Sequence, residues 1–204
     1  MAKTVNSLPD LVAGDDGRRR CAWGGSDPLY VEYHDHEWGR AQRDERGLFE
    51  LLCLEAFQSG LSWLLILRKR PGFRAAFHGF DPEAVAGYGD GDAARLLADD
   101  RIVRNRAKVE AAIANARAVV ALHEGGESLG DVVFAHAPAA DERPARRYRA
   151  LAEIPSSTPA STALSKDLRG RGFRFVGPVV AYAFMQAAGV VDDHLEGCWV
   201  SEDG

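Results

Sequence analysis

The sequence predicts an all-α fold. Apolar residues recur at helical spacing over 45–59 and again over 105–123, so each segment carries one wide apolar face. No alternating apolar and polar run predicts a pair of β-strands. Hydrophobic residues make up 46% of the 204 residues, which is enough for a sizeable core in one or two compact domains.

Glycine and proline divide the rest of the chain into shorter helices. Gly60 ends the helix at 45–59, Pro71 is expected to stop the next helix, and Asp81 before Pro82 is a typical N-cap. The further helices expected are 61–70, 82–87, 92–98, 161–168 and 179–188. Residues 125–150 are rich in Gly, Pro, Ala and Arg, so we expect a long loop with no more than one short helix there.

Charge and composition limit the classes of partner. The net charge is −5, so any surface that binds nucleic acid must be a local basic patch. Residues 1–19 have no apolar core of a signal peptide, and we expect a flexible polar extension there, followed by one domain over 20–204. The longest uncharged run, 175–191, is short for a membrane span. Three cysteines without a leader favour a reducing cytoplasm and no membrane.

Two cysteine–histidine pairs lie at opposite ends of the chain. Cys21 and His34 are near the start, and His194 and Cys198 form an H-x-x-x-C pair whose side chains would share one face of a helix. Two thiolates and two imidazoles form a closed tetrahedral set for zinc. Spacing alone leaves a chance arrangement open, since C-x12-H is not a standard finger spacing. Cys53 lies in an apolar helical run and is expected in the core.

The connection R-G-F-R-F-V-G, residues 171–177, precedes a predicted helix. Its glycines permit left-handed backbone, and its amides at a helix N-terminus suit an anion such as a DNA phosphate. Nearby basic residues and two further basic clusters, 68–70 and 101–108, make a basic face plausible. An ordinary turn with solvated arginines is the alternative.

A carboxylate among aromatic residues indicates a ligand pocket. Glu55 is the one charge in L-C-L-E-A-F-Q-S-G-L-S-W, and a carboxylate buried there needs partners or its pKa rises. The aromatic residues near it in the sequence or at the N-terminus are Trp23, Tyr30, Tyr33, Trp38 and Trp63. Rings plus one carboxylate suit a flat cationic ligand such as an alkylated purine, although aromatic core packing is the alternative.

Five stretches in order resemble 3-methyladenine DNA glycosylase I, the constitutive type. They are R-C-A-W-G-G-S-D-P-L-Y-V-E-Y-H-D-H-E-W-G (20–39), L-C-L-E-A-F-Q-S-G-L-S-W (52–63), E-I-P-S-S-T-P-A-S (153–161), L-S-K-D-L-R-G-R-G-F-R-F-V-G (164–177) and D-D-H-L-E-G-C (192–198). The resemblance implies the helix-hairpin-helix DNA glycosylase fold, with a zinc-bound substructure that joins the N- and C-terminal segments. The hairpin falls near 170–177.

The resemblance also assigns roles to residues. The structural zinc ligands it implies are Cys21, His34, His194 and Cys198. The catalytic residues it implies are Glu55 and Tyr33, and the residues that bind the base are Trp63, Trp23, Trp38 and Tyr30. The DNA contacts it implies are Gly60 and Leu61 as a wedge, together with Lys166, Gly172, Phe173, Arg174 and Gly177.

The expected activity is base-excision repair of double-stranded DNA that contains alkylated bases, through hydrolysis of the N-glycosidic bond of 3-methyladenine. No lysine stands out as a Schiff-base nucleophile, so we expect a monofunctional enzyme without lyase activity, and a monomer. Ala56 stands where the family commonly has glycine and Phe57 where it is often polar, and both are expected to neighbour the pocket. The alternatives are a non-catalytic DNA-binding module and a zinc hydrolase, which would need an open coordination position.

Overall fold

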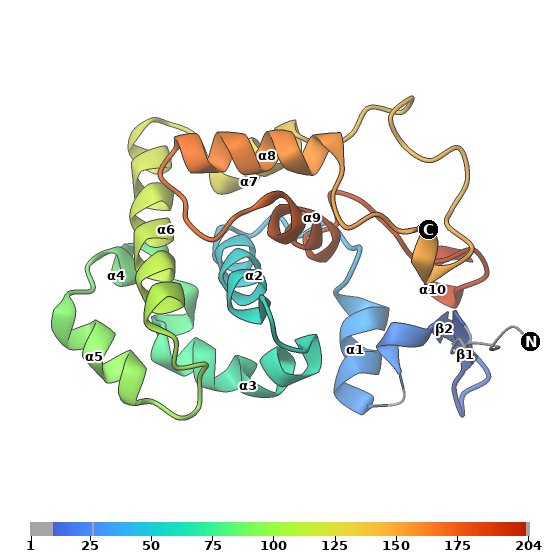
Figure 1. Ribbon diagram of the computed structural model, residues 1–204, viewed down its shortest axis with the longest axis horizontal. Helices are drawn as coiled ribbons and strands as arrows, with labels where there is room; N and C mark the ends of the chain where they lie inside the picture. Colours follow the sequence, from blue (N-terminus) through green and yellow to red (C-terminus); the bar gives the residue numbers. More distant parts are fainter. Residues whose placement is uncertain (1–9, 26, 203–204) are drawn as a thin grey trace, which may run out of the picture.

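The computed structural model describes residues 10–25 and 27–202, and this part of the chain is mostly helical, as predicted (Figure 1). Its α-helices are α1 Pro28–His36, α2 Glu45–Gln58, α3 Trp63–Ala76, α4 Pro82–Ala86, α5 Asp90–Ala98, α6 Arg106–Glu124, α7 Leu129–Ala135, α8 Pro159–Gly170, α9 Pro178–Ala187 and α10 Trp199–Glu202. Helices α2 and α9 pack against each other in the middle of the molecule. No helix of the described part is long and apolar enough to cross a membrane.

Two short strands, β1 Leu11–Ala13 and β2 Arg19–Cys21, form an antiparallel pair in which Leu11 lies opposite Cys21. The expectation of no strand pair is wrong here, because strands of three residues are too short to show an alternating pattern. The pair lies beside α10, so the N- and C-terminal segments meet at one end of the molecule (Figure 1). Residues 1–9 of the expected extension lie outside the described residues.

Helix α3 continues through Pro71 to Ala76, so the prediction that Pro71 stops this helix is wrong. An interior proline removes one backbone hydrogen bond and costs about 3 kcal/mol. Continuing the helix places Phe73 and Ala76 in the core with 0% and 1% exposure. Burying a phenylalanine contributes about 1.5–3 kcal/mol, and Arg70 and Arg74 on the same helix pair with the buried Glu50.

The predicted N-cap at Asp81, the predicted start of a helix at residue 105 and the predicted core position of Cys53 are confirmed. Asp81 accepts hydrogen bonds from the backbone N–H groups of Glu83 and Ala84, and so begins α4. The side chain of Asn105 accepts from Lys108 N at 3.2 Å and begins α6. Cys53 is 1% exposed in the main hydrophobic core, as predicted. Helix α2 is buried on most of its surface, and this explains why the sequence shows such a wide apolar face there.

Candidate active site and metal group

A cavity of about 330 Å³ opens between α1, α2, α3 and α9. Its lining residues are Trp23, Tyr33, Trp38, Glu55, Gln58, Trp63, Leu151, Ile154, Ala183 and Gln186. Five of the six residues predicted to act on the base therefore face one space, although they come from four separate segments of the chain. Most of the lining is aromatic or aliphatic, and few polar groups face the cavity.

Glu55 is the acidic residue of this cavity. It lies in the last turn of α2, and only 6% of the residue is exposed. Burial disfavours the carboxylate and raises the pKa of Glu55 to about 8. The structure shows no hydrogen bond or ion pair from its carboxyl group to another residue within 10–25 and 27–202. A buried carboxyl group without such a partner can accept a hydrogen bond from a cationic ligand in the cavity.

Tyr33 and Trp63 form one wall beside Glu55. Their ring centroids are 5.2 Å apart, and burial raises the pKa of the Tyr33 hydroxyl well above its ordinary value. The indole Nε1 of Trp63 is buried and has no hydrogen-bond partner in the described part of the chain. Buried indole N–H groups are normally paired, so this donor is available to a polar ligand in the cavity. Trp63 owes its position to Ser62, whose hydroxyl caps the start of α3.

The remaining predicted aromatic residues extend this wall toward the chain termini. The rings of Trp23 and Trp38 meet edge to face with centroids 4.8 Å apart, and both line the cavity. Tyr30 does not line the cavity. It packs against Trp23 at 5.9 Å, and its hydroxyl accepts a hydrogen bond from Leu64 N at 3.2 Å. Tyr30 therefore supports the first turn of α3.

Sequence reasoning missed a polar residue on the far wall. Gln186 of α9 lines the cavity and donates from Nε2 to Asp193 Oδ2 at 2.7 Å. Tyr182 donates to the same oxygen at 2.5 Å. Because a carboxylate only accepts hydrogen bonds, this contact fixes the side-chain amide of Gln186 with its N–H group toward Asp193. The M-Q-A segment gave only an apolar helical pattern, so no sequence signal pointed to it.

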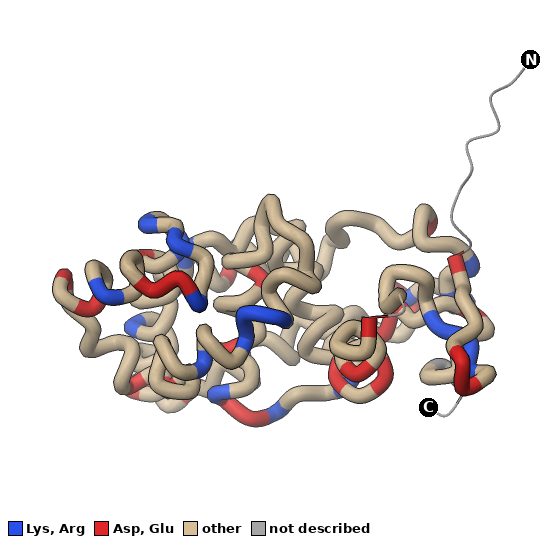
Figure 2. Tube along the Cα trace, turned by 90° about the horizontal axis from the view of Figure 1, so that it is seen from below, with Lys and Arg blue, Asp and Glu red and all other residues tan. Residues whose placement is uncertain are grey.

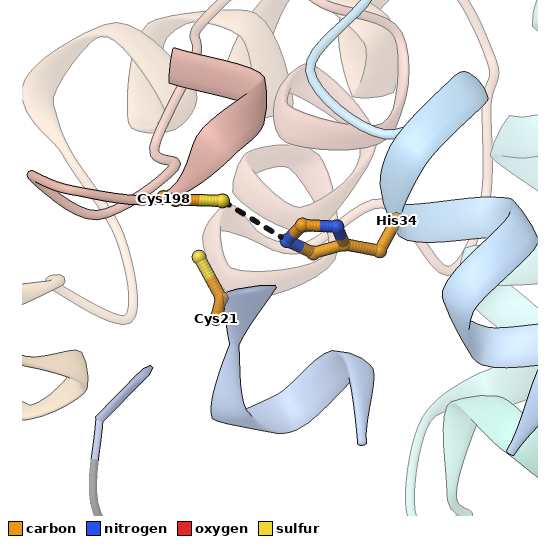
Figure 3. Close-up of side chains that lie close together, drawn as sticks. All are labelled: Cys21, His34 and Cys198. Atoms are coloured by element: carbon orange, nitrogen blue, oxygen red, sulfur yellow. Dashed lines mark hydrogen bonds between the residues drawn. The ribbon is translucent and has the colours of Figure 1, made fainter. Parts of the chain in front are cut away.

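The structure brings together three of the four predicted metal ligands. The ligand atoms of Cys21, His34 and Cys198 lie within 4.8 Å of one another, and all three residues are buried (Figure 3). Cys198 Sγ is 3.6 Å from His34 Nε2. The Cys21 thiol donates a hydrogen bond to Cys198 and holds the pKa of Cys198 well below its usual range. A thiolate beside a second thiol and an imidazole nitrogen is a donor set that fits zinc.

The fourth predicted ligand, His194, lies beside this group. Its ring centroid is 4.9 Å from that of His34, and its Nε2 is 3.3 Å from the backbone oxygen of His34. Residues 194–198 form a turn with Gly197 at φ 81°, so the expectation that this pair could share a helix face is wrong. Gly39 is required opposite, because a Cβ there would lie 2.9 Å from His194 Cε1.

Carboxylates orient both imidazoles. His34 Nδ1 lies 2.8 Å from Asp35 Oδ1, and His194 Nδ1 lies 2.6 Å from Asp192 Oδ1. A neutral ring that donates from Nδ1 to its carboxylate presents Nε2 as the nitrogen for a metal ion. Asp192 therefore lies beside the predicted metal ligand His194. The same rings support the cavity, since Trp23 packs on His34 at 5.2 Å and Trp38 packs on His194 at 4.6 Å.

The two predicted DNA-contacting turns are exposed. The wedge turn, residues 59–61, has Gly60 at φ 82° and Leu61 with 36% of its surface exposed. The hairpin turn, residues 171–177, has Gly172 at φ 94°, and Gly177 caps α9. Phe173 does not fit its predicted role as a DNA contact, because its side chain is 3% exposed in the core.

Phe175 is the exposed aromatic residue of the hairpin turn instead, with 42% of its surface exposed and φ 57°. The sequence could not separate the two phenylalanines of R-G-F-R-F. The positive φ angles of Gly172 and of Phe175 itself, 94° and 57°, determine which of the two side chains points outward.

Most of the expected basic clusters are neutralised by neighbours. Arg68 pairs with Asp27, Arg70 pairs with Glu37 and Glu50, and Arg101 pairs with Asp99. Figure 2 accordingly shows basic and acidic positions mixed over the trace. Near the hairpin turn, Arg171 pairs with Glu127 and Asp167. Lys166, Arg169 and Arg174 form no ion pair with any other described residue, which leaves a small local basic patch.

Ala56 and Phe57 follow the lining residue Glu55 in α2, but their own side chains do not line the cavity. Phe57 is fully buried and packs on Phe73 and Phe77, with ring centroids 4.7 and 6.0 Å apart. Ala56 is 3% exposed. Neither departure therefore contributes a side chain to the lining of the cavity.

Comparison with known proteins supports the same assignment. The family model for methyladenine glycosylase matches residues 23–201. The chain is 48% identical to DNA-3-methyladenine glycosylase 1 of Escherichia coli strain K12, over 88% of this chain and 95% of that protein. It is 42% identical to DNA-3-methyladenine glycosylase of Haemophilus influenzae, over 88% of this chain and 96% of that protein.

Solved structures agree with these relatives. A crystal structure of 3-methyladenine DNA glycosylase I matches with a TM-score of 0.83 and 49% identity, covering 88% of this chain and 98% of that one. A variant of 3-methyladenine DNA glycosylase I in complex with 3-methyladenine matches with a TM-score of 0.82 and 36% identity, covering 89% of this chain and 96% of that one. The chain belongs to the methyladenine glycosylase family.

Proposed function

We propose that this protein removes 3-methyladenine from alkylated double-stranded DNA by hydrolysing the N-glycosidic bond. The observation that carries the proposal is the aromatic cavity with one buried, unpaired carboxyl group, Glu55, and one unpaired indole donor, Trp63. The relatives are named for the same activity. A cavity of about 330 Å³ is at the lower end of the size of small-molecule sites and suits a single base taken out of the stack.

The chemistry of the lesion fits the site. Methylation at N3 puts a positive charge on adenine and weakens the glycosidic bond, so the base leaves neutral and needs no strong general acid. Glu55 accepts hydrogen bonds from the base edge, Tyr33 contacts the same edge, and Trp63 stacks on the ring. A cation in the cavity favours the carboxylate form of Glu55 and so counteracts the effect of burial on its pKa. Normal adenine is neutral and lacks this interaction.

We further propose that zinc is held by Cys21, His34, His194 and Cys198. The buried thiolate, thiol and imidazoles support this set, and a site closed by four protein ligands is structural. Bound zinc supplies a cross-link between the N- and C-terminal segments. Through the contacts of Trp23 on His34 and Trp38 on His194, this cross-link also supports one cavity wall.

The wedge turn and the hairpin turn are the proposed DNA contacts. Leu61 fills the gap left by the flipped nucleotide, and the amides of the hairpin turn bind a phosphate at the N-terminus of α9. Lys166 and Arg174 lie in the unpaired basic patch and contact the backbone. We expect a monomer without lyase activity.

The test is release of 3-methyladenine from methylated duplex DNA by the zinc-loaded protein, comparing the wild type with Glu55→Gln. Wild-type release that is strongly reduced in Glu55→Gln supports the activity and the site together. Equal release by both proteins refutes the role of Glu55. No release by a folded wild type refutes the activity and leaves a DNA-binding module.

A further inference from the structure

Two buried polar side chains lie on one face of α6 and form hydrogen bonds to backbone groups. One bonds at the wedge turn and the residues just before it, and the other bonds within the hairpin turn. They are Lys108 and Asn115, which are 8% and 0% exposed. Their positions differ by seven, so they lie about two helical turns, or about 10 Å, apart on the same side of α6. We infer that Lys108 and Asn115 are positioning residues that hold the wedge turn and the hairpin turn at a fixed spacing on α6. The inference rests on the proposed function of these turns in DNA binding.

Lys108 holds the flank of the wedge turn. Its Nζ donates to the backbone oxygen of Phe57 at 2.8 Å and to that of Ser59 at 2.6 Å. Both carbonyls belong to the C-terminal end of α2, where helix carbonyls lack an internal partner and a cation is favoured. The turn is also closed from within, since Leu61 N donates to Gln58 O at 2.6 Å. Lys108 therefore joins the base of the wedge turn to α6.

Asn115 holds the hairpin turn through both backbone groups of Arg174. Its Nδ2 donates to Arg174 O at 3.1 Å, and its Oδ1 accepts from Arg174 N at 2.7 Å. On the other side of Phe175, Ser165 Oγ donates to Val176 O at 2.6 Å. These bonds flank Phe175, whose left-handed backbone conformation is unfavourable for a residue with a side chain. The hairpin turn passes beside the middle of α6 in Figure 1.

This arrangement has a consequence for base flipping. Unstacking a base is unfavourable, so the wedge turn must enter the duplex while the hairpin turn holds the phosphate backbone. If the two turns moved independently, they would have to be ordered when DNA binds, and this cost would reduce the energy gained from the DNA contacts. The hydrogen bonds of Lys108 and of Asn115 clamp the two turns to one helix, so the turns cannot move independently. Because each residue holds a different turn, its replacement should have a different effect.

Lys108→Met should lower the single-turnover rate of excision at saturating enzyme by about tenfold, because a lost hydrogen bond to a charged group has about that effect. Its Kd for undamaged duplex should stay within about twofold of the wild type. Asn115→Leu should instead raise the Kd for undamaged duplex by about tenfold and leave the saturated excision rate within about twofold. Both variants should bind 3-methyladenine as the wild type does.

The matched control is Arg117→Met. Arg117 also lies on α6 and donates to two backbone oxygens, those of Ala86 and Tyr88, which belong to a segment away from both turns. It should change neither constant. The inference is overturned if each of Lys108→Met and Asn115→Leu changes the excision rate and the Kd for undamaged duplex together. It is also overturned if neither variant changes either quantity, or if Arg117→Met has the same effects as they do.

A measurement on the wild type keeps the test valid if a variant does not fold. Hydrogen exchange should show the Arg174 amide, which donates to Asn115, strongly protected although it lies in a surface turn. Exchange at the rate of an unstructured chain would overturn the clamp. If the wild type released no 3-methyladenine, the proposed function would fail, whereas duplex binding and amide protection would still test the clamps.

Discussion

Glu55→Gln should stabilise the protein by an amount that grows with pH. The pKa of Glu55 is raised from 4.5 to about 8 by burial, so the folded protein keeps this proton in a range where the unfolded chain has lost it. The free energy of unfolding of the wild type therefore falls as pH rises from about 4.5 to about 8, and this effect levels off above pH 8. At about 1.4 kcal/mol per pH unit, the cost is about 1 kcal/mol at pH 5 and about 3 kcal/mol at pH 7. Glutamine does not ionise and does not carry this cost.

The assay is equilibrium denaturation of both proteins at several pH values between 5 and 8. The difference in free energy of unfolding should increase by about 2 kcal/mol between pH 5 and pH 7. Glu124→Gln is the matched control, since Glu124 is exposed and its replacement should give a difference that stays within about 0.5 kcal/mol. A constant difference between the wild type and Glu55→Gln would show that the Glu55 carboxyl is hydrated or paired, and would refute the argument from burial.

Three further predictions concern the cavity, the core and the metal group. Trp63→Ala should weaken binding of 3-methyladenine by about 1–3 kcal/mol, measured by titration calorimetry, and an unchanged Kd would exclude stacking on this ring. Phe57→Leu should lower the unfolding midpoint by removing packing on Phe73, yet leave the Kd for the base unchanged. Cys198→Ser, or prolonged chelation, should reduce metal content and lower the unfolding midpoint, read by metal analysis and calorimetry. Immediate loss of excision on chelation with native helicity would instead make the metal catalytic.

The sequence predicted the helices well where local signals and core packing agree. Helices α2 and α6 have both periodicity and an N-cap, and their bounds were predicted within a few residues. Pro71 shows the opposite case, because its local preference is overridden by the burial of Phe73 further along α3. The strand pair depends on contacts with α10 at the other end of the chain, and no local pattern reports such contacts.

At the site, residue chemistry could be predicted better than residue orientation. The position of Glu55 in an apolar helix was enough to predict a perturbed carboxyl group, because burial follows from its neighbours in the sequence. The direction of the Tyr30 and Phe173 side chains could not be predicted. A side chain next to a site can face the ligand or the core with the same sequence pattern. Lys108 looked like part of a solvated basic cluster, yet it is buried on two backbone oxygens.

The buried carboxyl group connects stability with selectivity. A protein gains nothing in folding from Glu55, because an ionisable group in an apolar cavity makes the folded state less stable above pH 4.5. The same unfavourable environment strengthens its attraction for a cation, since a cavity lined by Trp23, Tyr33 and Trp63 screens charge poorly. A neutral adenine entering the cavity would leave the carboxyl protonated and receive no such attraction. Under the proposed function, discrimination against normal bases follows from the same desolvation that destabilises the free protein, so a variant that relieves this destabilisation should lose selectivity as well.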